Sequence, residues 1–258
     1  MIERPACFAH TSGMIRIPFP LTAAFFAAIF LWVSPGRAQS SPSKPLPDHY
    51  TQQEPTRDGT GKIYMGREIS QVVGHTAVTW LERPEREREE KPDLVIENME
   101  LKPTDVAVDV GAGSGYFSFR MAPKVPQGKV IAEDIQQPML DFISERSKQL
   151  GVKNVETLLG TVEDTKLAEN SVDVVLLVDA YHEFSHPREM MLSIFKGLKS
   201  GGRLIQLEYR GEDKFVPIKP LHKMTEKQVI LEQSSVGFKH VETRSFLPSQ
   251  HFLVFVKP

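Results

Sequence analysis

One run of residues limits the fold of this chain more than any other. Val172–Val178 (VDVVLLV) is apolar at six of its seven positions, as expected for a strand that is buried on both faces of a parallel sheet. Similar β-like runs precede and follow it, and helix-like segments separate them. The β-like runs are 106–110, 129–132, 155–159 and 203–208, and the helix-like segments are 114–122, 137–150 and 187–198. This alternation predicts a doubly wound α/β layer with right-handed crossovers.

The last part of the chain breaks the alternation. After a helix predicted over 225–235, two β-like runs at 239–243 and 252–256 are joined only by residues 244–251, which include Pro248. A parallel return needs about a dozen residues or more, usually a helix. We therefore predict that the last strand runs antiparallel to the others.

An uncharged apolar run, Leu21–Val33, lies near the N-terminus and is followed by the small residues Gly36 and Ala38. The run is too short to span a bilayer comfortably, and its context fits a secretory signal that is cleaved after Ala38. The pattern predicts a signal peptide over 1–38, with Met14 as an alternative start, and export to the periplasm or to the outside of the cell. An uncleaved membrane anchor and a buried core helix are the alternatives.

The segment before the α/β layer is expected to have two parts. Residues 39–61 are rich in Pro, Ser and Gln and show no apolar period, which predicts a flexible linker. Residues 62–93 are expected to form a helical cap or lid. Within it, we expect one or two short helices over residues 63–81. A further helix would begin at Pro84, with its dense charges in solvent. A catalytic domain over 94–258 is expected to follow.

A glycine-rich stretch follows the first predicted strand of the layer. Val108–Tyr116 (VDVGAGSGY) has glycine at positions 111, 113 and 115, between a strand and the start of a helix. Such a turn lets main-chain atoms approach a nucleotide-like ligand, although a tight connection without a ligand is an alternative. The spacing G-x-G-x-G differs from the dinucleotide fingerprint G-x-G-x-x-G, which disfavours a nicotinamide oxidoreductase.

Together with three further motifs, this stretch resembles the class I S-adenosylmethionine-dependent methyltransferases over about residues 94–258. The motifs are VDVGAGSGY, AEDIQQPML at the second strand, GTVEDTKLAENSVDVVLLVDAYHEF across the third and fourth, and LKSGGRLIQLEY at the fifth. The resemblance implies a doubly wound seven-stranded sheet that is mostly parallel with an antiparallel last strand, the Rossmann-like methyltransferase fold. It also implies S-adenosylmethionine as the cofactor, and no metal is expected.

The resemblance implies which residues hold the methionine part and the ribose of the donor. The backbone of the glycine turn would approach the methionine part, and an aspartate before the turn would hold its ammonium, directly or through water. An aspartate at the tip of the second strand would accept both ribose hydroxyls, with its neighbour Glu133 as a less favoured stand-in. These residues are Asp109, Gly111, Ala112, Gly113, Gly115 and Asp134.

The adenine site departs from the family pattern. The family often has Gly-Asp-Ala at this point, where this chain has Gly-Thr-Val-Glu after its third strand. A threonine hydroxyl or a glutamate would therefore replace the aspartate, and two aliphatic side chains would sandwich the ring. These residues are Thr161, Glu163, Val162 and Ile135. An ordinary solvated loop at Glu163 and Asp164 is the alternative.

Residues 179–183 follow the fourth strand, which in this family faces the sulfonium and the acceptor, so Asp179 is expected beside the donor. Methyl transfer is an in-line displacement that needs alignment, exclusion of water and, for a hydroxyl acceptor, proton removal. His182 is the candidate base, with a hydrogen bond to its own loop as the alternative. Tyr181 is expected to wall the methyl site or to lie in the core. Further acceptor-side candidates are Tyr64, Met65, His75, Trp80, Tyr209, Arg210, His222 and Lys223.

Composition limits the class of acceptor. The formal net charge is −2 and no cluster of Lys and Arg stands apart from acidic residues, so a nucleic-acid substrate gains no support. The single cysteine, Cys7, excludes a disulfide within the chain and a cysteine metal site. We expect an exported methyltransferase that acts on a small-molecule or lipid-like acceptor. The alternatives are a non-catalytic exported protein that binds S-adenosylmethionine or a nucleoside, and a protein or RNA methyltransferase.

Overall fold

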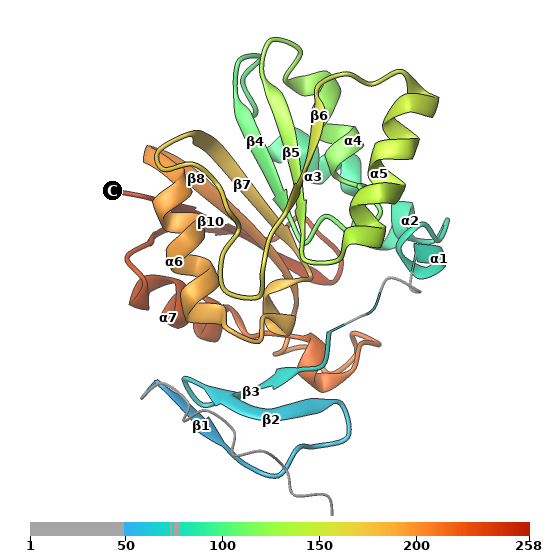
Figure 1. The fold of residues 1–258 in the computed structure, drawn as a ribbon. Coiled ribbons are helices and arrows are strands. Elements are labelled where there is room, and N and C mark those ends of the chain that lie inside the picture. Colours follow the sequence, from blue (N-terminus) through green and yellow to red (C-terminus); the bar gives the residue numbers. More distant parts are fainter. Residues whose placement is uncertain (1–48, 73, 75–77) are drawn as a thin grey trace, which may run out of the picture. The chain divides into compact units, whose positions relative to one another are not determined.

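A seven-stranded sheet forms the main layer of the structure, a computed structural model that describes residues 49–72, 74 and 78–258 (Figure 1). The strand order is β6-β5-β4-β7-β8-β10-β9. Pairs among β4 to β8 are parallel, whereas β10 runs antiparallel to both β8 and β9. The predicted fold class is confirmed, including the antiparallel last strand. The strands are β4 Val106–Val110, β5 Lys129–Asp134, β6 Val155–Leu159, β7 Val172–Val178, β8 Leu198–Tyr209, β9 Lys239–Arg244 and β10 Gln250–Val256.

The predicted signal peptide, residues 39–48 of the predicted linker and His75 lie outside the described residues. The signal peptide and the export that follows from it therefore stay predictions. In the part of the chain that the structure describes, no helix is long and apolar enough to cross a membrane.

Helices cover both faces of the seven-stranded sheet (Figure 1). One group of helices lies on one face and a second group on the other, because right-handed crossovers place their helices on opposite faces on the two sides of the point where the strand order reverses. The first group is α3 (Pro92–Asn98), α4 (Ser118–Met121, continued by the 3-10 turn η2, Ala122–Lys124) and α5 (Gln137–Leu150), and the second is α6 (Pro187–Gly197) and α7 (Glu226–Ser235).

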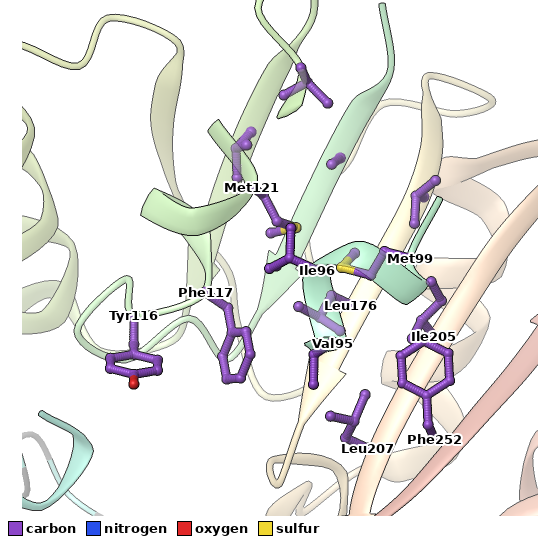
Figure 2. Close-up of a cluster of buried hydrophobic side chains, with 14 of the residues drawn as sticks. Val95, Ile96, Met99, Tyr116, Phe117, Met121, Leu176, Ile205, Leu207 and Phe252 are labelled. Atoms are coloured by element: carbon purple, nitrogen blue, oxygen red, sulfur yellow. The ribbon is translucent and has the colours of Figure 1, made fainter. Parts of the chain in front are cut away.

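The apolar core under α3 ties the helix to the middle of the sheet. Figure 2 shows Val95 of α3 and Met99, the residue at the C-terminal cap of this helix, with Leu176 of β7 and Phe252 of β10, and all four side chains are fully buried. Positions 95 and 99 lie one helical turn apart and so face the same way. Burial of each such side chain contributes about 1.5–3 kcal/mol, so this cluster fixes the central strands whose ends carry the candidate site.

Residues 50–70 form a small antiparallel sheet, so the predictions of a linker up to residue 61 and of helix from residue 63 are wrong. Its strands are β1 (Tyr50–Gln52), β2 (Gly59–Tyr64) and β3 (Arg67–Ser70), in that order. Met65 and Gly66 join β2 to β3 with φ of 47° and 92°, and positive φ at both central residues is what a two-residue type I′ turn requires. The strands form because aromatic and β-branched side chains on them pack together as a cluster, made of Tyr50, Tyr64 and Ile69.

The predicted charge-dense helix is broken in two. After α1 (Val78–Leu81), α2 covers Arg86–Glu90 and α3 begins at Pro92. Lys91 between them has a φ of 48°. A proline disfavours the helical conformation in the residue before it and cannot donate a backbone hydrogen bond, so a continuous helix from Pro84 is excluded. The predicted helical cap is therefore a hairpin followed by short helices.

Candidate functional site

A cavity of about 490 Å³ lies at the carboxyl ends of β4, β5 and β7. β4 pairs with β5 on one side and with β7 on the other, so the direction of winding reverses at this point of the sheet. Ligands of open α/β sheets bind outside the carboxyl ends of the strands at such a switch point. The volume falls in the range of small-molecule sites, roughly 300–1,000 Å³.

The glycine turn after β4 lines this cavity. Gly111 and Gly113 have φ of 70° and 55°, a region that side chains other than glycine rarely adopt. A Cβ atom at Gly111 would lie 3.0 Å from the Cβ of Ala180, and one at Gly113 would lie 2.9 Å from Cδ1 of Leu81. Gly111 and Gly113 therefore present bare backbone to the cavity, as the resemblance implies, and Ala112 between them adds only a methyl group.

Gly115 does not line the cavity, which corrects its expected contact with the donor. It also has a positive φ, 75°, but a Cβ atom there would lie 2.9 Å from the Phe119 ring and 3.0 Å from Ile143. Because Ile143 belongs to α5, glycine at 115 lets the turn pack closely against that helix. Its role is in packing.

Two aspartates stand beside the turn. Asp134, at the end of β5, is 5% exposed and accepts the backbone N–H groups of Gly113 (2.9 Å) and Gln136 (2.8 Å), one on each carboxylate oxygen. Burial raises its pKa. Asp109 is 3% exposed and accepts a 2.6 Å hydrogen bond from the Ser118 hydroxyl, while burial raises its pKa to about 6. Both line the cavity and leave lone pairs for a ligand.

Glu133, the predicted stand-in for Asp134, also lines the cavity, but one of its carboxyl oxygens is directed toward the end of β6. A Cβ atom at Gly160 would lie 1.8 Å from Oε1 of Glu133, so that oxygen sits over the end of β6. Among the described residues this oxygen has no hydrogen-bond partner. Burial and the charge of Asp134 raise the pKa of Glu133 well above its ordinary value. Both carboxyl groups therefore lie beside the glycine turn, and Asp134 is the one that accepts the N–H group of Gly113.

The predicted adenine residues divide into two pairs. Ile135 and Val162 line the cavity and are 36% and 42% exposed, so their aliphatic faces are open. Thr161 and Glu163 do not line it. The Thr161 hydroxyl instead donates to the backbone oxygen of Asp164 at 3.3 Å, which corrects the expectation that either of the two contacts the adenine amine from this wall.

Asp179 follows β7 and places a carboxylate on the cavity wall. Its Oδ2 accepts a 2.6 Å hydrogen bond from the Gln250 side chain, and its Oδ1 is buried without a hydrogen-bond partner among the residues that the structure describes. Burial, followed by the charges of Glu90 and Glu208, raises its pKa well above the ordinary value. A φ of 49° at a non-glycine residue shows that the chain holds this side chain in place against backbone strain.

His182 is 2% exposed and both of its ring nitrogens are engaged. Nδ1 lies 2.7 Å from Oε2 of Glu208, and Nε2 lies 3.2 Å from Nδ1 of His222 and 3.7 Å from Oε1 of Glu183. Burial alone would lower the pKa of His182, but the carboxylates of Glu208 and Glu183 outweigh burial and raise the pKa to about 10. At neutral pH the free ring thus holds a proton, which does not suit a general base.

Tyr181 lies in the core. Its ring is fully buried under α6, and its hydroxyl donates a 2.7 Å hydrogen bond to Glu232. It does not line the cavity, so of the two predicted positions the core is the one observed. Of the further acceptor-side candidates within the described residues, Trp80, Tyr209 and His222 line the cavity, and Tyr64, Met65, Arg210 and Lys223 do not.

A buried charge network on α2 was missed by the sequence-based prediction, which left these charges in solvent. Glu90 is 2% exposed and accepts hydrogen bonds from Arg83 (2.8 Å), Arg86 (2.6 Å) and the hydroxyl of Tyr209 (3.2 Å). All four side chains line the cavity. The spacing of Arg86 and Glu90, four residues apart on one helix face, is the only signal of the network in the sequence.

Comparison with known proteins shows what this fold and site are similar to. Residues 101–246 match the family model of a methyltransferase domain. The uncharacterized methyltransferase YcgJ of Bacillus subtilis (strain 168) is 29% identical over 121 residues, which are 46% of this chain and 47% of the relative. A protein of Ectopseudomonas mendocina (strain ymp), named ubiquinone/menaquinone biosynthesis C-methyltransferase UbiE, is 30% identical over 118 residues, 45% of this chain and 46% of the relative. The chain spans about half the length of these curated relatives.

A solved structure supports the fold. The SAM-dependent methyltransferase from Aquifex aeolicus matches with a TM-score of 0.69 and 23% sequence identity, over 72% of this chain and 100% of that chain. At this identity the likeness concerns the arrangement of strands and helices.

Proposed function

Because the chain belongs to the methyltransferase-domain family, we propose that it is an S-adenosylmethionine-dependent methyltransferase that acts on a small or lipid-like acceptor bound in the cavity described above. The observation that carries the proposal is the joint lining of one cavity by the glycine turn, by Asp134 and by Asp179. Its size suits a small molecule. The names of several relatives, which refer to ubiquinone and menaquinone biosynthesis, support the same class of acceptor.

For the donor, we propose that the backbone of residues 111–113 receives the methionine part and that Asp109 faces its ammonium. Asp134 would accept the two ribose hydroxyls through the lone pairs that its backbone contacts leave free. Ile135 and Val162 would hold the adenine between aliphatic faces. This arrangement directs the sulfonium toward the end of β7.

For the acceptor, we propose that Asp179 is the group that receives a proton when a hydroxyl is methylated. In that step the acceptor oxygen forms the new bond to the methyl carbon, the carbon–sulfur bond breaks with its electron pair left on sulfur, and the hydroxyl proton passes to the carboxylate. Oδ1 of Asp179 has no hydrogen-bond partner among the described residues, whereas the free His182 ring already holds a proton.

The acceptor class is tested by following a labelled methyl group. The purified full chain is incubated with methyl-labelled S-adenosylmethionine and a cell extract, which is then separated into organic-soluble, small polar, protein and RNA fractions. We expect the label in the organic-soluble or small-molecule fraction. Label in protein or RNA alone, or in no fraction, would contradict the proposal, and the last result would favour a non-catalytic binding protein.

Substitution of the glycine turn tests the donor site. We expect Gly113→Val to weaken the binding of S-adenosylmethionine about tenfold in calorimetric titration, since a β-branched residue at positive φ costs roughly 1–3 kcal/mol and its Cβ would meet Leu81. Gly151→Val is the matched control, because Gly151 has a φ of 66° with nothing within 4 Å of its Cβ position. NADH should not bind measurably to the unsubstituted protein. Equal effects of the two substitutions on donor affinity would count against the proposed donor site.

A further inference from the structure

Three side chains of the kinds that bind metal ions converge on one wall of the cavity. His182 and Glu183 belong to the 3-10 turn η3 (Tyr181–Glu183), and His222 ends a second 3-10 turn, η4 (Pro220–His222). One ligand atom from each lies within 4.8 Å of the other two. We propose that these three residues form a binding site for one divalent transition-metal ion of the Zn²⁺ type on the acceptor side of the cavity.

The separations of the three atoms match the edges of a coordination sphere. Nε2 of His182 lies 3.2 Å from Nδ1 of His222. Oε1 of Glu183 lies 3.3 Å from Nδ1 of His222 and 3.7 Å from Nε2 of His182. Two ligand atoms that each lie 2.0–2.1 Å from a tetrahedral ion are themselves roughly 3.3 Å apart. A single ion therefore fits among the three atoms with small side-chain adjustments, and its binding displaces the proton that the free His182 ring holds.

The donor set and its position leave room for a further ligand. Two imidazoles and one glutamate are the protein ligands of one class of catalytic zinc site, in which the fourth position stays open. All three residues line the cavity, so this position is reached from the space where the acceptor binds. An oxygen atom of the acceptor or a water molecule is the ligand that such a position takes.

The surroundings of His182 orient its ring for this role. Glu208, which is fully buried, holds Nδ1 at 2.7 Å and leaves Nε2 directed at Glu183 and His222. A carboxylate that holds the second nitrogen of a metal-binding histidine is the usual outer-shell partner in such sites. The backbone of η3 is held as well, since Arg67 and Ser70 of β3 both donate to the carbonyl oxygen of His182 at 3.2 Å.

Titration with zinc tests the site directly. The purified full chain is freed of metal with a chelator, returned to chelator-free buffer and titrated with ZnCl₂ in a calorimeter without donor or acceptor. We expect one Zn²⁺ per chain, with affinity at least about 100-fold weaker in His222→Ala and about 10–100-fold weaker in Glu208→Gln. His240→Ala is the matched control, because His240 lies on β9 and contacts Thr243 at 2.9 Å, outside the cluster.

A spectroscopic readout separates this site from adventitious binding. Co²⁺ in place of Zn²⁺ should give visible absorption bands of nitrogen and oxygen ligation that His222→Ala abolishes and His240→Ala preserves. Absence of one-to-one binding, or binding that His222→Ala leaves intact, would overturn the proposal and leave an ordinary pair of hydrogen-bonded histidines. The role of the open position rests on the proposed function, but metal binding does not. A protein that binds no zinc could therefore still transfer the labelled methyl group, so the two experiments fail independently.

Discussion

Replacement of Asp134 by alanine is expected to weaken S-adenosylmethionine binding by about 100-fold or more. The carboxylate is the proposed acceptor for both ribose hydroxyls, and each hydrogen bond to a charged group contributes about 1.5–3 kcal/mol. Loss of two such bonds amounts to about 3 kcal/mol or more, where 1.4 kcal/mol corresponds to a factor of ten. Calorimetric titration with S-adenosylmethionine measures the change.

The fold should survive this substitution. Burial raises the pKa of Asp134, so its ionised carboxylate is itself costly to bury, and its removal offsets part of the loss of the contacts to the N–H groups of Gly113 and Gln136. Asp141→Ala removes an exposed aspartate from α5 and serves as the matched control. An Asp134→Ala protein that melts like the unsubstituted protein and binds the donor within threefold would refute the assignment of the ribose contact.

Replacement of Arg67 by alanine is expected to lower the free energy of unfolding by about 3–5 kcal/mol, the range for breaking a buried ion pair. Its guanidinium donates to both carboxylate oxygens of Glu232, at 2.7 and 3.0 Å, and Glu232 is fully buried. The substitution leaves that carboxylate with the hydroxyl of Tyr181 and the amide of Gln228 but without a compensating charge. Urea denaturation followed by circular dichroism gives the value.

An exposed arginine supplies the comparison. Arg88 pairs with Glu89 at 3.3 Å, but its side chain is 81% exposed, and pairs of this kind contribute about 0–1 kcal/mol. We expect Arg88→Ala to change the free energy of unfolding by less than 1 kcal/mol. If Arg67→Ala lowers the free energy of unfolding by no more than Arg88→Ala does, the ion pair between the hairpin and α7 is not a main source of stability.

The main sheet was predictable from the sequence because its signals are local. A strand that is buried on both faces needs apolar residues at nearly every position, and Val172–Val178 shows this without reference to the rest of the chain. The antiparallel last strand followed from a connection, 244–251, that is too short for a crossover. In the structure, β10 pairs with both β8 and β9 in the antiparallel direction.

The N-terminal hairpin was missed because its turn carries an unusual residue. A type I′ turn is usually signalled by Asn-Gly or Asp-Gly, whereas this chain has Met65-Gly66, and methionine is a good helix former. The strands are held by contacts with distant residues as well. Lys62 donates to the backbone oxygen of Ser185 at 2.6 Å, and the Tyr50 hydroxyl donates to Glu189 at 2.5 Å. Local sequence patterns do not predict such contacts between residues that are far apart in the chain.

The candidate site was predicted in its backbone and less well in its side chains. The positions of Gly111, Gly113 and Asp134 follow from the ends of β4 and β5, which the motifs place correctly. Tyr181 and Thr161 lie in irregular turns. Whether their side chains face the cavity depends on the local backbone conformation, which the periodicity of apolar residues does not predict. The cluster of His182 with His222 joins residues 40 positions apart, and no motif in the sequence links them.

The place of β10 between β8 and β9 constrains the order in which the sheet is assembled. β9 is earlier in the chain than β10, yet among the strands that the structure describes its one neighbour is β10. It therefore has no backbone partner until the later strand is present, whether the two associate first as a pair or β10 first adds to β8. The edge of β8 consequently lacks its partner until β10 has joined it, and an unpaired edge of a long strand is a site to which a strand of another chain can add.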